Sequence, residues 1–131
     1  MKRLIVAVLA TALLAASVGG AYASTTTYKT RFVQFKLQTS SGKRTFSGQI
    51  DSSSSSSTCV KGRSVSVIRK SNGNKQTLGK DKTSSKGKFS IALSSGQVKN
   101  GSYYAKVGSK KYDNGKKECG SAQSGTIKVS S

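Results

Sequence analysis

Short runs in which apolar and polar residues alternate are the feature that most constrains this fold. They recur along the chain between Gly, Asn and Ser, and no segment shows helical periodicity longer than one turn. Alternation with a period of two is typical of strands that bury one face. We therefore predict an all-β protein of seven antiparallel strands, a single β-sandwich or barrel. The expected strands are Thr27–Gln38, Arg44–Asp51, Arg63–Lys70, Lys75–Lys80, Gly87–Leu93, Gly101–Gly108 and Gly125–Ser130.

Local details support this interpretation in two places. In the first expected strand Arg31, Val33, Phe35 and Leu37 share one parity, which predicts that they share a face, although a further phenylalanine interrupts the pattern. The stretch Ser71–Asn74 reads SNGN, and Asn-Gly tolerates positive φ at both central positions of a tight hairpin turn. We expect a hairpin there.

The N-terminal residues indicate export. Lys2 and Arg3 precede the apolar run Leu4–Val18, and AYA then places small residues before Ser24. This is the layout of a cleaved secretory signal peptide, with cleavage expected after Ala23. A membrane anchor is the alternative, but the run is short against the ~20 apolar residues that span a bilayer. We expect residues 1–23 to be the signal peptide and 24–131 to be one secreted or envelope-associated domain.

A run of serines, Ser52–Ser57, raises the question of one domain or two. Only two expected strands precede it, and an isolated pair of strands is marginally stable in water. The segment Ser52–Lys61 is therefore predicted to be a loop within one domain. It is either a flexible connecting loop with no role in binding, or a polar binding loop at one end of the sandwich.

Two cysteines, Cys59 and Cys119, lie in the exported part. In a small secreted domain they most simply form one disulfide, within one chain or between two. Within one chain it would close a loop of about 60 residues and stabilise the fold by about 4 kcal/mol in the chain-entropy model. A structural zinc site needs four ligands, and the chain has no histidine to add to two thiolates.

Four segments together resemble the carboxypeptidase regulatory-like, transthyretin-like β-sandwich family. They are FSGQIDS (46–52), GRSVSVIRK (62–70), TSSKGKF (83–89) and GSYYAKV (101–107). The similarity covers about Phe46–Val129, and the cysteine positions are similar to those of small exported bacterial variants. Ser84 stands where the family pattern has aspartate. The resemblance implies a fold and no active site, because the matching residues are structural ones.

The sequence contains few of the residue combinations that catalysis requires. Without histidine there is no Ser-His-Asp or Cys-His triad, and a hydrolase among the transthyretin-like relatives requires histidines that this chain lacks. The acidic residues Asp51, Asp81, Asp113 and Glu118 are too scattered for a calcium loop. Ser-Lys pairs are too common in this sequence to be informative. We expect a non-enzyme with no cofactor and no metal.

The charge points to binding. The formal net charge is +19, or +17 without residues 1–23. Such a surface aids solubility and also attracts polyanions. We expect a monomer that binds an anionic cell-envelope polymer electrostatically, with no specific nucleic-acid partner and no stable membrane span. The alternative is a secreted factor that recognises a protein or ligand through its loops. The anion-binding candidates are Lys61, Arg63, Arg69, Lys70, Lys86, Lys88, Lys110 and Lys111.

Overall fold

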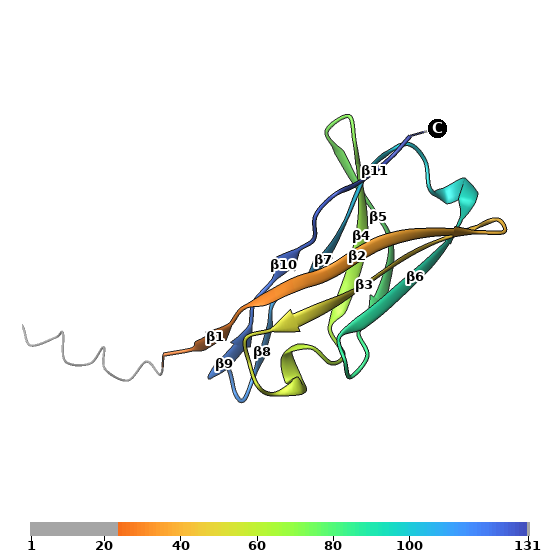
Figure 1. The fold of residues 1–131 in the computed structure, drawn as a ribbon. Helices are drawn as coiled ribbons and strands as arrows, with labels where there is room; N and C mark the ends of the chain where they lie inside the picture. Colours follow the sequence, from red (N-terminus) through yellow and green to blue (C-terminus); the bar gives the residue numbers. More distant parts are fainter. Residues whose placement is uncertain (1–23, 131) are drawn as a thin grey trace, which may run out of the picture.

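The computed structural model describes residues 24–130, and they form an all-β fold, as predicted (Figure 1). The predicted signal peptide lies outside the described residues. Two 3-10 turns, η2 (Ser57–Cys59) and η3 (Ser95–Gln97), interrupt the strands. The strands are β1 (Thr26–Tyr28), β2 (Thr30–Ser40), β3 (Lys43–Ser52), β4 (Ser64–Ser71), β5 (Asn74–Lys82), β6 (Lys88–Ser94), β7 (Gly101–Val107), β8 (Lys110–Tyr112), β9 (Lys117–Cys119), β10 (Ala122–Gln123) and β11 (Ile127–Val129).

Two sheets build the sandwich. One has the order β2-β3-β6, and the other has the order β10-β7-β4-β5 with β11 also paired to β7. A small third sheet, β1-β9-β8, extends from one end (Figure 1). Each of the seven predicted strands is present, and the additional strands are short. One pair departs from the antiparallel prediction, because β1 runs parallel to β9.

Aromatic rings join the two sheets across the core. Phe46 of β3 stacks on Tyr103 of β7, with ring centroids 5.1 Å apart. Phe35 of β2 stacks on Phe46 at 5.7 Å, and Phe32 meets Phe89 of β6 edge-on at 5.9 Å. Burial of each large apolar side chain stabilises the fold by roughly 1.5–3 kcal/mol. A chain with few apolar residues thus concentrates its aromatic side chains in one continuous core.

A β-bulge in β2 corrects the prediction for the first strand. The register with β3 shifts between Phe32 and Gln34, so that Phe32 and Phe35 both pack against the core. Val33 is 49% exposed, contrary to the expectation that it shares an inner face with Phe35. Arg31, expected on the same face, is also exposed. The extra residue of a bulge changes the parity of the strand, which is why simple alternation failed here.

The sandwich has two ends, which are named here by their elements (Figure 1). The disulfide end comprises β1, β8, β9 and the loop 53–63. The η3 end comprises η3 and the β2–β3 and β4–β5 turns, and the backbone N–H of Ser95 donates to the carbonyl of Gly42 there. The β4–β5 turn is the predicted hairpin, with φ of 52° at Asn72 and 80° at Gly73.

Candidate anion-binding surface

The serine-rich loop 53–63 is ordered by its own hydroxyl groups. The backbone N–H groups of Ser54, Ser56 and Thr58 each donate to the side-chain oxygen two residues earlier, at 3.1, 3.1 and 3.2 Å. Serine and threonine hydroxyls stabilise turns in this way. The loop is therefore a succession of hydrogen-bonded turns.

Two attachments fix this loop to the rest of the disulfide end. Ser53 and Lys29 exchange hydrogen bonds, the N–H of Ser53 donating to the Lys29 carbonyl and the N–H of Lys29 to the Ser53 hydroxyl. Cys59 in η2 forms a disulfide with Cys119 in β9, and both cysteines are fully buried. The predicted disulfide is confirmed, and it closes within one chain.

Arg63 lies inside the protein. Its side chain is 2% exposed, and the guanidinium donates to backbone carbonyls of Cys59 at 2.7 Å, Gly108 at 2.6 Å and Gly120 at 3.0 Å. Its Nη1 also donates to the Thr30 hydroxyl at 3.3 Å. The structure therefore places Arg63 outside the exposed basic surface, contrary to the sequence-based prediction. It joins the loop to three separate segments of the disulfide end.

Carbonyl oxygens surround the Arg63 guanidinium in place of a carboxylate. Burial lowers the pKa of Arg63, because desolvation disfavours the charged form. A guanidinium nevertheless stays protonated in proteins, so the group remains a donor. Removing it would leave several buried acceptors without a partner, each at a cost of about 1–3 kcal/mol.

The other predicted binding residues lie at both ends of the molecule. Their side chains are exposed except for Arg69, which is partly buried and donates through Nε and Nη2 to the Asn100 carbonyl. Arg69 and Lys70 are at the η3 end of β4. Those at or near the disulfide end are Lys61 (loop 53–63), Lys86 (the turn before β6), Lys88 (β6), Lys110 and Lys111 (both β8). The structure therefore does not bring the predicted residues together into one site.

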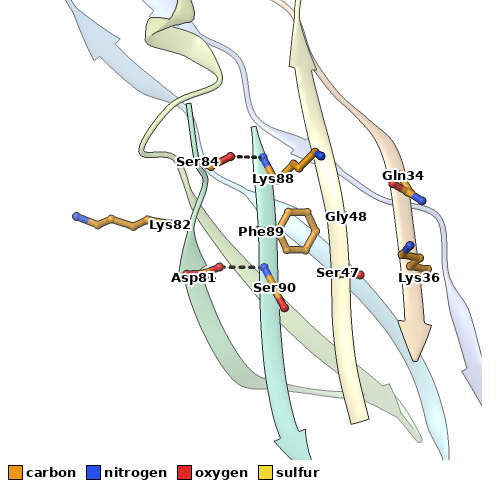
Figure 2. A pocket seen from close by; sticks show the side chains of 10 residues that line it. All are labelled: Gln34, Lys36, Ser47, Gly48, Asp81, Lys82, Ser84, Lys88, Phe89 and Ser90. Atoms are coloured by element: carbon orange, nitrogen blue, oxygen red, sulfur yellow. Dashed lines mark hydrogen bonds between the residues drawn. The ribbon is translucent and has the colours of Figure 1, made fainter. Parts of the chain in front are cut away.

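An open hollow of about 470 Å³ lies on the β2-β3-β6 sheet and beside the end of β5. Cross-strand pairing sets Lys36, Ser47 and Ser90 side by side on its floor. Figure 2 shows Lys88 reaching across β3, whereas Lys82 points to the opposite side. Amines, hydroxyls, an amide and the Asp81 carboxylate thus line a shallow polar surface.

Sequence reasoning missed Lys36 and Lys82 as lining residues of this hollow. The signal for Lys36 was its place on the polar parity of β2, next to Gln34, once the bulge is taken into account. Lys82 ends β5 and gave no such signal, because its closeness to β6 depends on the packing of the two sheets. The hollow also holds Asp81, whose carboxylate accepts the N–H of Ser90 at 2.9 Å (Figure 2).

Acidic side chains neutralise little of this charge. Within residues 24–130 one ion pair forms, between Arg31 and Asp51 at 3.2 Å, with the two side chains 74% and 51% exposed. The Ser52 N–H and the Arg31 guanidinium lower the pKa of Asp51. Lys111 lies opposite Glu118 in the β8–β9 register. Most of the exposed bases are thus available to an external anion.

Metal sites, membrane-spanning helices and similarity to known proteins give no further indication of function. In the part of the chain that the structure describes, no group of three or more His, Cys, Asp and Glu side chains could hold a metal ion. Within the same residues, no helix has the length and apolar character needed to cross a bilayer. No protein-family model, curated protein or solved structure matches the chain. The resemblance to the transthyretin-like family therefore stays a prediction.

Proposed function

We propose that this chain is a secreted, non-catalytic β-sandwich of the carboxypeptidase regulatory-like type that binds anionic cell-envelope polymers through its basic surface. The observation that carries the proposal is the imbalance of charge: a formal net charge of +17 without residues 1–23, with one ion pair among residues 24–130. Most of these bases are exposed, whereas Arg63 is buried and Arg44 and Arg69 are partly buried.

The mechanism follows from the placement of the lysines. They lie at both ends and over the β2-β3-β6 sheet, so a flexible polyanion can follow the surface without one fixed geometry. Lysine amines act as hydrated point charges on mobile stems. Binding of a polyanion to such a surface releases counterions from the polymer, which makes affinity fall steeply as salt rises.

The test is retention of the oxidised protein from Ser24 onward on immobilised polyphosphate and polygalacturonate, each across a sodium chloride series. We expect retention on both matrices to collapse between about 50 and 300 mM, with a log–log slope of several units, as in counterion release. An uncharged dextran matrix is the control. Retention that persists at high salt would contradict the proposal.

Two matched triple variants test whether the charge acts as a spread surface. One replaces Lys82, Lys86 and Lys88 by Gln around the hollow, and the other replaces Lys61, Lys110 and Lys111 by Gln at the disulfide end. Each removes an equal charge from exposed positions. We expect similar losses of retention from both. A loss confined to one set would instead indicate a localised site.

The ordered serine loop favours a second candidate function, loop-mediated recognition of a protein or ligand. Its turns are hydrogen-bonded and its end is tied by the disulfide, while Ser55 and Ser57 remain exposed. A preorganised loop binds at a lower entropic cost than a mobile one. Binding to envelope fractions that survives high salt and is lost in a Ser55→Glu, Ser57→Glu variant would favour this function.

A further inference from the structure

The η3 end contains an arginine, Arg44, that forms no ion pair within the described residues. Arg44 of β3 has the same parity as Phe46 and Ile50, so it faces inward at the end of the core. Its side chain is partly buried, and its Nε is buried without a hydrogen-bond partner in the described structure. An unpartnered buried donor is costly, which is why such groups in native proteins call for an explanation.

A second arginine approaches from the opposite sheet. Arg69 of β4 lies opposite Tyr103 of β7 in register, and its guanidinium donates to the Asn100 carbonyl at 3.0 Å through Nε. Burial raises the pKa of the Tyr103 phenol, and the positive charges of Arg69 and Arg44 lower it. Arg44 is two residues from Phe46 on the same face of β3, and the Phe46 ring stacks on that of Tyr103 at 5.1 Å, so both arginines lie near the same phenol, one from each sheet.

A hollow of about 280 Å³ opens beside Arg69 at this end. Arg69 and Lys99 supply its cations, Gln76 and Gln97 supply amides, and Leu78 supplies an apolar wall. The hydroxyl of Tyr103 donates to the Lys99 carbonyl, which ties this wall to the core. Cationic side chains from three segments, β3, β4 and the β6–β7 connection, thus lie at one end, and those of Arg69 and Lys99 line the hollow.

None of the four acidic side chains, all of which the structure describes, lies at this end. Asp51 and Asp81 sit near the ends of β3 and β5 away from η3, and Asp113 and Glu118 belong to the β8–β9 hairpin at the disulfide end. Within the described residues, these arginines therefore have no acidic side chain to balance their charge.

We propose that Arg44, Arg69 and Lys99 form a binding site for one oxyanion group, a carboxylate or a phosphate. A guanidinium presents its N–H groups in a planar fork that matches two oxygens of either group, and a charge-assisted bond would give the Arg44 Nε an acceptor. The site goes beyond the proposed function, because it would bind a small free anion saturably and with one-to-one stoichiometry, whereas the polymer surface needs no defined site.

The test follows the side-chain Nε–H signals of arginine in ¹⁵N-labelled oxidised protein by NMR. Inorganic phosphate is titrated at a constant ionic strength of about 150 mM, at which exposed charges more than about 8 Å apart are largely screened. We expect the Arg44 and Arg69 signals to shift saturably with one site, while the Arg31 signal does not. A parallel titration with acetate distinguishes a carboxylate-bearing from a phosphate-bearing source by which anion binds more tightly.

Matched variants complete the test. Arg44→Met is expected to weaken binding of the tighter anion at least tenfold, and Arg44→Lys, which keeps the charge but loses the fork, at least several-fold. Lys75→Met, an exposed base at the same end, is the control and should leave binding unchanged. Circular dichroism verifies that each variant is folded.

Two results would overturn the proposal. One is the lack of any saturable shift at Arg44 with either anion, and the other is equal weakening by Lys75→Met and Arg44→Met. A loss of salt-dependent polymer retention would leave the proposal standing, because retention reports on the spread lysines. Saturable anion binding and polymer retention can therefore fail separately.

Discussion

The two ends of the sandwich use inward-facing arginines in opposite ways. At the disulfide end, Arg63 has four acceptors around its guanidinium, all from the chain itself. At the η3 end, Arg69 has one backbone carbonyl, and the buried Nε of Arg44 has no partner in the described structure. An unsatisfied buried donor calls for an explanation, and the one proposed above is an external anion. The comparison thus sets a fully hydrogen-bonded arginine against two arginines that we propose bind an anion.

The disulfide should give the largest effect on stability. Replacing Cys59 and Cys119 together by Ala removes a crosslink across a sequence separation of 60 residues. We expect a loss of about 4 kcal/mol in the free energy of unfolding, since the unfolded chain gains the freedom of that loop. Urea unfolding measures it. A loss below about 1 kcal/mol would show that the hydrogen bonds alone hold the disulfide end.

Arg63→Met should give the next largest loss, about 3 kcal/mol, because buried carbonyls lose a charged donor. Arg31→Met is the matched control: it removes an exposed ion pair, and we expect a loss under about 1 kcal/mol. Urea unfolding of both variants measures the difference. Equal losses would contradict the structural role given to Arg63.

Arg69→Met tests the comparison between the two ends at the η3 end. It removes the bonds to the Asn100 carbonyl, which is at an exposed position. We expect a loss of about 1 kcal/mol, because water can replace a donor there. Thermal unfolding at matched pH provides the measurement. A loss as large as that of Arg63→Met would mean that both ends depend on their arginines for folding.

The smallest effect is a pH dependence from Tyr103. Burial raises the pKa of its phenol in the folded state above the unfolded value. This contribution to stability is therefore complete below the ordinary tyrosine pKa of about 10 and is lost as pH rises above it. We expect the stability difference between the wild-type protein and Tyr103→Phe to shrink between pH 9 and 11, as measured by urea unfolding. A constant difference would contradict the assigned cause.

Local chemistry made part of the fold predictable. The Asn72–Gly73 turn followed from the two residues that it contains, and the positions of the main strands followed from alternation. The pairing of Cys59 with Cys119 followed from there being two cysteines in the chain. None of these inferences needed information on how distant segments pack.

What depends on packing was missed. The bulge at Val33 and the parallel pairing of β1 with β9 require knowledge of the neighbouring strands. The burial of Arg63 could have been predicted, because Arg63 and Arg69 share the parity of the buried valines in β4. A basic residue beside a loop was instead expected on the surface. Arg44 carried the same signal in β3. Alternation marked these arginines as inward-facing, but the prediction for Arg63 followed its charge and placed it on the surface.

The most direct test of the central claim measures the free energy of unfolding of Arg63→Met and Arg44→Met, each with and without saturating phosphate. We predict that Arg63→Met loses about 3 kcal/mol and is still stabilised by phosphate, as ligand linkage requires of an intact site. Arg44→Met should lose under about 0.5 kcal/mol, because its buried Nε has no partner to lose, and should gain clearly less stability from phosphate than the wild-type protein. Arg63→Lys replaces Arg63→Met if the latter does not fold. The reverse pattern would contradict the account: a large loss in Arg44→Met together with undiminished stabilisation by phosphate.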